Sequence, residues 1–485
     1  MNAERPLHLW PSICLSAVLC AVLPAGRVAH AAGAAPSVWE ISPYKIHFML
    51  AFAPEPELTP RLRQQVEARV LERAEKVVGA GWDLSIEAAP AEIVPGMLRS
   101  LARLPIEDLP AMLVESEVDK LILAVVRLTD RGGYEIEARD YDLHARLTGS
   151  PVVRPVPQRE LLADEVFQAV LLAFAPLARI DDVEDKQVKL RLRAGSLPTI
   201  DPEISFTGPG SVFRAVRRFN DREGKLRKLM PIEWTLLVVD QVQVMEAEVA
   251  CTIYSGLRSP LTGRSRGRDE RLAMLVRPTG GTTQIELQSR MLGDDPKTVR
   301  PLAGYAIYAH PAGAPQTTLI GRTDGDGKLA IPADASPVRI LLVKHGGEPL
   351  ARLPLIPGLE PHLKVEVADD DQRLLAEGII NGFQERFVDL IARRQVAFAQ
   401  IRARLEESKP AEAKTLLDAV RGLGRQEDLI NEIRIQKQQA VSDDRRIQKK
   451  IDKLFDDTQE VVIRYLNSTE IDKLESEIAA KLKGG

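Results

Sequence analysis

The first 31 residues constrain the rest of this chain most, because they have the form of an export signal. Arg5 supplies a positively charged start, Leu9 to Leu23 form an apolar run, and Ala29-His30-Ala31 is a small-x-small site that predicts cleavage before Ala32. The mature chain is therefore expected to fold and work outside the cytoplasm of a bacterium, in the periplasm, on the cell surface or in the medium.

A membrane anchor is the alternative for the same segment. A transmembrane helix needs about 20 uninterrupted apolar residues, and Pro11, Pro24 and Arg27 break this stretch. Glu4 weakens the positive start, which keeps an uncleaved anchor open. We expect cleavage, and no transmembrane span in the chain that remains.

Cysteine content adds a second constraint on the mature fold. Cys14 and Cys20 leave with the leader, so Cys251 alone remains and no internal disulfide can form. Stability must come from burial, and 45% hydrophobic with 28% charged residues is an ordinary globular composition. A length of 485 residues allows several domains. The net charge of −4 favours no particular class of partner.

Residues 32–185 mix apolar periods of 2 and 3.6, which predicts an N-terminal α/β sandwich. Thr59 is a good N-cap before Pro60, and the apolar residues after it recur on one helix face. The expected elements are strands at 44–52, 121–128 and 134–139 and helices at 60–79 and 160–177.

Residues 186–299 lose the helical period and show short alternating runs between glycine and proline turns. Such a series of strands predicts a small β-barrel, for which we consider an SH3-like form. The expected strands are 188–192, 234–244, 248–254, 272–276 and 283–287.

Residues 300–368 carry the only pattern that points to a family. A strand at 305–309 is followed by Gly321-Arg322-Thr323-Asp324-Gly325-Asp326-Gly327, a tight turn, and by a second strand from Val338 to Lys344. This region resembles the carboxypeptidase regulatory-like module. The resemblance implies an Ig/transthyretin-like β-sandwich that serves as a spacer or binding surface, and it implies no chemistry.

Residues 369–485 read as helices with narrow apolar stripes between many charged residues, which suits a helical hairpin or coiled coil. A long first helix includes Phe398, a second begins at Pro410 and ends at Gly422, and a third starts at Gln426. Two more follow, one capped by Ser442-Asp443 and one over 471–482.

Catalytic patterns are present but lack their structural context. Gly263-Arg264-Ser265-Arg266-Gly267 fits the serine-hydrolase pattern, yet no apolar strand precedes it and no helix follows it. Asp140 and Asp142 lie on one face of a strand, about 7 Å apart, as in several hydrolases. We interpret them as a structural pair balanced by Arg139.

Metal and nucleophile patterns are equally weak. Asp324-Gly325-Asp326-Gly327 lacks the later ligands of a calcium loop and is better explained as a turn. The mature histidines have no partner at helical metal-site spacing, and Cys251 reads as a small core residue. We therefore expect no catalytic, cofactor-binding or metal-binding residues.

A basic run is the strongest local charge feature of the mature chain. Exposed in a loop, it is either a plain solvated segment or a patch for an anionic envelope polymer or an acidic partner. Nucleic acid is not expected outside the cytoplasm. The residues of this basic patch are Arg214, Arg217, Arg218, Arg222, Lys225, Arg227 and Lys228.

These observations favour a non-enzymatic, envelope-associated adaptor or scaffold that acts through protein–protein association. Protein partners in the envelope are expected, and self-association through the C-terminal helices is one way to meet them. Two other functions stay open. One is a periplasmic sensor with a small ligand between the α/β domain and the barrel, and the other is a weak hydrolase around Asp140 and Asp142.

Overall fold

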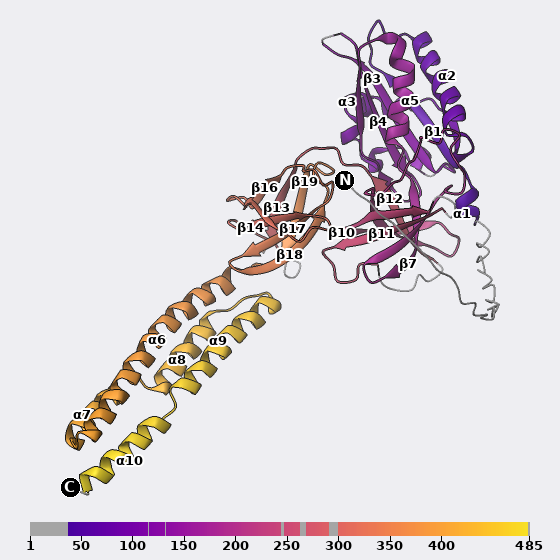
Figure 1. The fold of residues 1–485 in the computed structure, drawn as a ribbon. Coiled ribbons are helices and arrows are strands. Elements are labelled where there is room, and N and C mark those ends of the chain that lie inside the picture. Colours follow the sequence, from indigo (N-terminus) through magenta and orange to yellow (C-terminus); the bar gives the residue numbers. More distant parts are fainter. Residues whose placement is uncertain are drawn as a thin grey trace, which may run out of the picture.

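The computed structural model describes residues 37–114, 116–130, 132–243, 247–261, 268–290 and 299–483. The fold is mixed α+β, with several β-sheets followed by C-terminal helices, as the sequence predicts. Figure 1 shows the α/β region at one end, a barrel and two further sheets in the middle, and a helical arm that projects away from them. The leader lies outside the described residues.

The α/β region contains a six-stranded sheet of order β2-β1-β3-β4-β5, with β6 paired to β4. Strand β1 is parallel to both β2 and β3, and β3 is antiparallel to β4. The strands are β1 (Tyr44–Phe52), β2 (Trp82–Ile86), β3 (Lys120–Leu128), β4 (Tyr134–Asp142), β5 (Leu147–Thr148) and β6 (Val152–Val156).

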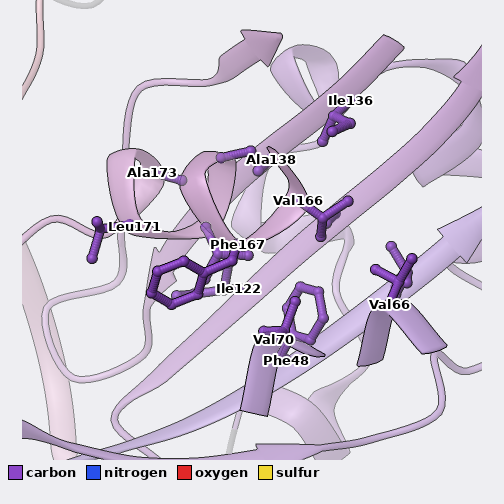
Figure 2. Packing of buried hydrophobic residues seen from close by; sticks show 14 of the residues in the cluster. Phe48, Val66, Val70, Ile122, Ile136, Ala138, Val166, Phe167, Leu171 and Ala173 are labelled. Carbon is purple, nitrogen blue, oxygen red and sulfur yellow. The ribbon is translucent and has the colours of Figure 1, made fainter. Parts of the chain in front are cut away.

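Helices cover both faces of this sheet, which explains why β3 is a continuous apolar run rather than an alternating one. On one face Ile122 packs with side chains of α2 (Pro60–Val77) and α5 (Leu162–Ala173). Figure 2 shows these side chains meeting between the sheet and the two helices. On the other face Leu121 and Leu123 pack against the segment that begins with α3 (Val94–Arg99).

Two elements of this region differ from the sequence prediction. Strand β2 was not predicted, because its five residues are too few and too mixed to show a period. The final helix was predicted to reach Leu177 but ends at Ala173, because Leu177 begins the first strand of the barrel.

The barrel is closed, in the order β10-β11-β8-β7-β12-β9. Its interior is filled by apolar side chains such as Phe213 and Leu237. The sequence prediction placed residues up to 185 in the first region, which is wrong for β7, because β7 is a barrel strand. The long strand β9 was not predicted. The strands are β7 (Leu177–Glu184), β8 (Gln187–Leu192), β9 (Val212–Asn220), β10 (Leu226–Gln243), β11 (Glu248–Ser255) and β12 (Asp269–Val276).

Two sheets follow the barrel, one of order β16-β13-β19 and one of order β15-β14-β17-β18. They share one core, in which Ile285 and Val365 of the first sheet pack with Ile307 and Leu341 of the second. The strand at 283, predicted for the barrel, pairs instead with β16 and β19. The strands are β13 (Thr283–Ser289), β14 (Ala306–Pro311), β15 (Thr318–Arg322), β16 (Lys328–Ile331), β17 (Arg339–His345), β18 (Glu348–Leu355) and β19 (His362–Val367).

The arm is built on one long helix, α6, whose 36 residues span about 54 Å at roughly 1.5 Å per residue. Its first half packs with α8 and α9, and its second half packs with α7 and α10, so the arm has two successive apolar cores. No described helix is long and apolar enough to span a bilayer. The helices are α6 (Asp371–Glu406), α7 (Pro410–Gly422), α8 (Gln426–Gln439), α9 (Arg445–Tyr465) and α10 (Thr469–Lys483).

Candidate functional site

Asp140 and Asp142 form a buried ion cluster with Lys120 where the α/β region meets the barrel. The register of β3 and β4 sets Lys120 opposite Asp142, and the alternation of a strand puts Asp140 on the same face. The Nζ of Lys120 lies 2.8 Å from Oδ2 of Asp140 and 3.0 Å from Oδ2 of Asp142. All three side chains are at most 1% exposed.

The surroundings of the cluster are closed by backbone and aromatic groups. Ala175 N donates to Oδ2 of Asp140 at 2.8 Å, and Ala145 N donates to Oδ1 of Asp142 at 2.7 Å. The rings of Tyr44 and Phe174 lie 5.5 and 5.3 Å from Nζ of Lys120. Within the part of the chain that the structure describes, both carboxylates are closed off from solvent. A substrate could reach them only if this interface unpacked.

Burial and charge act in opposite directions on this cluster. Burial lowers the pKa of Lys120, but the carboxylates of Asp140 and Asp142 raise it more, so the net pKa lies above that of an ordinary lysine. Lys120 is therefore the counter-charge of the pair. The prediction that Arg139 balances the pair was wrong, because its guanidinium donates instead to the carbonyl oxygens of Gly149 and Leu101.

The cluster also ties the two regions together along the chain. Leu177 N, at the start of β7, donates to the hydroxyl of Tyr44 at 2.9 Å. Arg277, just after β12, donates from Nη1 to the carbonyl of Phe174 at 2.6 Å. Tyr44 of β1 therefore bonds to the start of β7, and Phe174, just after α5, bonds to the residue that follows β12. Strands β7 and β12 are neighbours in the barrel.

A second buried ion cluster joins the two sheets that follow the barrel to the arm. Arg373 of α6 is 1% exposed and Asp370 is 0% exposed, and Nε of Arg373 lies 2.8 Å from Oδ1 of Asp370. Nη2 of Arg373 donates to the carbonyl of His345 at 2.9 Å. The His345 ring stacks on Tyr305 at 4.1 Å, and the Tyr305 hydroxyl accepts from Asp370 N. None of these residues was predicted from the sequence to belong to an ion cluster.

The contact between the barrel and the two sheets that follow it is largely apolar, and the ion pair of Arg214 with Glu360 also joins them. Val212 and Leu236 of the barrel pack with Val338 and Ile340 near the start of β17. Gly256 approaches this contact so closely that a Cβ there would lie 2.1 Å from the carbonyl oxygen of Arg352, so only glycine fits.

The structure divides the predicted basic patch. Arg214 pairs with Glu360 at 2.7 Å, Arg217 pairs with Asp269, and Arg218 is buried and donates to the carbonyl of His144. These three lie on β9 rather than in a loop. The remaining four residues are exposed on the hairpin that β9 and β10 form: Arg222 and Lys225 in its turn, and Arg227 and Lys228 at the start of β10.

Asp324, from the sequence that resembles a calcium loop, has a structural role in a turn. Oδ1 of Asp324 accepts from the backbone N–H groups of Asp326 and Lys328, which closes the tight turn. Within the described ranges, no three His, Cys, Asp or Glu side chains gather as metal ligands. The serine-hydrolase pattern at 263–267 lies outside the described residues.

Cys251 is fully buried in the barrel core, which leads to a testable prediction. Burial, with a smaller contribution from Asp240, raises the pKa of its thiol to about 12. Since the thiolate is the reactive form, the native protein should not react with Ellman's reagent over an hour at pH 8. The same sample in guanidinium chloride should react at once, and rapid reaction of the native protein would contradict the burial.

Comparison of the sequence with models of protein families finds no match, and comparison with curated proteins finds none either.

Proposed function

We propose that this chain is an exported, envelope-associated bacterial adaptor that acts through association and not through catalysis. One observation carries the proposal. Each boundary between successive folded regions is closed by buried side chains: the Lys120 cluster, the apolar contact around Leu236, and the Arg373 cluster. Such joints make a rigid body that holds its two ends apart, which is what a scaffold requires.

The finer fold assignments belong to the same proposal. The two sheets that share one core support a transthyretin-type β-sandwich, which would begin at β13 rather than at residue 300. We further propose that the barrel has an SH3-like form. Modules of both kinds are common spacers or binding surfaces, and neither brings catalytic groups of its own.

The arm is the proposed partner-binding element. It carries large apolar side chains that are exposed, among them Val388 at 65% and Tyr465 at 60%. Val461 and Tyr465 lie four residues apart on α9 and therefore on one face. Exposed apolar side chains next to one another on a helix suit contact with a second helix.

Affinity purification of the tagged mature protein from its native envelope tests this function. The full chain should retain a partner that a version ending at Ala368 loses and that a Val461→Glu/Tyr465→Glu double variant holds at least tenfold more weakly. Glu460→Lys/Arg464→Glu, which reverses a highly exposed ion pair on the same helix, is the matched control and should retain the partner. Retention by the truncated version would move recognition to the β regions, and absence of any partner would refute the adaptor.

A further inference from the structure

A cavity of about 380 Å³ lies between the α/β region and the barrel, with Phe174 in its wall. Its walls come from the start of β1 and β2, the end of α5, the barrel strand β10 and the loop 193–207 between β8 and β9. Small-molecule sites are typically cavities of this size and form preferentially at such boundaries between domains.

The walls of the cavity are mainly aromatic. Trp82 and Phe206 are stacked with their ring centroids 5.8 Å apart, and Phe174 lies 4.8 Å from both rings. Tyr44 meets Phe174 edge to face at 5.0 Å. These rings come from four separate elements. Tyr44 and Phe174 are at most 3% exposed and Trp82 is 8% exposed. The half-buried Phe206 therefore offers most of the ring surface to a bound molecule.

The loop that closes the cavity is seated closely on the α/β region. Ile200 lies over Gly79, where a Cβ would come within 2.7 Å of the isoleucine side chain, and Gly79 has a φ of +67°. Only glycine combines this backbone with this contact. The loop is thus held in place by its own packing, so the cavity does not depend on a ligand to form.

The charge of the wall identifies the class of ligand. The ionised side chain in it is Arg193, and its Nη2 lies 2.6 Å from Oδ2 of Asp119, so its charge is matched within the protein. The wall hydroxyls of Thr199 and Ser205 already donate to carbonyl oxygens. A charged ligand would therefore lose its hydration and gain no counter-charge.

Two wall residues have a buried donor without a partner in the described part of the chain, Arg193 at Nε and Trp82 at Nε1, and the neutral donor is that of Trp82. Trp82 is 8% exposed, and its Nε1 is buried with no hydrogen-bond partner in the described part of the chain. Buried donors are nearly always paired, so an unpaired one beside a cavity points to an occupant that supplies an acceptor.

We propose that this cavity binds a small, uncharged aromatic molecule that carries one hydrogen-bond acceptor. This site is independent of the adaptor function: a partner could bind the arm whether the cavity is filled or empty. If both are correct, the chain would carry a ligand at the boundary between its first two regions.

Prodan, an uncharged naphthalene with one ketone, is a suitable probe because its emission shifts to the blue in an apolar site. The mature full-length protein should bind one Prodan per chain, and it should bind the anionic anilinonaphthalene sulfonate at least tenfold more weakly. Bound Prodan should also raise the melting temperature. Equal affinity for both probes, or no saturable binding of Prodan, would overturn the proposal.

Two variants that fill the cavity from different elements locate the site. Leu197→Trp acts from the loop and Val242→Phe acts from the barrel, and each should weaken Prodan binding at least tenfold. Glu203→Trp is the control, since Glu203 is on the same loop, is exposed and is not part of the wall. If Leu197→Trp does not fold, Val242→Phe decides, and unchanged binding by a folded filled variant would refute this location.

Discussion

Replacing Lys120 with methionine is expected to destabilise the protein by about 3–5 kcal/mol, the cost of leaving a buried charge without its partner. Asp140 and Asp142 would then face each other in an interior that is at most 1% exposed, without the ammonium group that lies within 3.0 Å of both. Urea unfolding of the mature protein, monitored by circular dichroism, measures the loss. The loss should appear in the unfolding transition of the α/β region and the barrel, because the cluster joins these two regions.

Two further variants separate the charge from the packing. Lys120→Met combined with Asp140→Asn and Asp142→Asn should recover much of the stability, because a buried ion cluster replaced as a whole is often nearly neutral. Lys76→Met is the surface control, since Lys76 is 67% exposed and pairs with Glu72. Its loss should cost less than about 1 kcal/mol. A loss that small for Lys120→Met would show that the cluster is not the joint described above.

Replacing Arg373 with methionine is expected to free the arm from the two sheets that precede it. Asp370 would lose its partner, and the carbonyl of His345 would lose a donor, in a site that is 1% exposed. The expected cost is about 3–5 kcal/mol. Because the contact is at the base of α6, small-angle X-ray scattering should show a wider spread of arm orientations, with both parts still folded.

Arg386→Met is the matched control on the same helix, because Arg386 is 66% exposed and pairs with Glu432. Its scattering profile should match that of the unmodified protein. Asp370→Asn with Arg373→Met should restore part of the lost stability, since it removes the uncompensated charge. An unchanged profile for Arg373→Met alone would mean that other contacts, such as Lys450 with Glu348, hold the arm by themselves.

Helices were the part of the fold most open to prediction from the sequence. Thr59 accepts from Leu62 N at the start of α2, as its position before Pro60 suggested. Helices α7 and α8 begin at Pro410 and Gln426 as expected. Local signals suffice for these elements, because a cap or an apolar face is contained within the helix itself.

Strands were assigned less well, because the sheet that a strand joins depends on partners far along the chain. Strand β7 directly follows α5 and looks like the end of the α/β region, but it pairs with β8 and β12. Strand β13 follows β12 closely, yet its parallel partner is β19. No pattern inside either strand states these partners.

The candidate sites show the same division. The spacing of Asp140 and Asp142 was enough to place both carboxylates on one face, but their cation came from a neighbouring strand. Lys120 at the head of an apolar run was a usable signal, because a charged residue there requires a buried partner. The pairing of Arg373 with Asp370 could also have been predicted from the sequence, because the two residues are three positions apart at the start of α6.

The pairings of the barrel also bear on how the chain acquires its structure. Strand β7 begins at Leu177 and must wait for β12, which begins at Asp269, before the barrel can close. In the arm, α7 packs on the adjacent α6 and α8 on the adjacent α9, so part of its core forms from local contacts, and folding slows as contacts become less local. We therefore expect the arm, although it is synthesised after the barrel, to reach its final structure faster than the barrel.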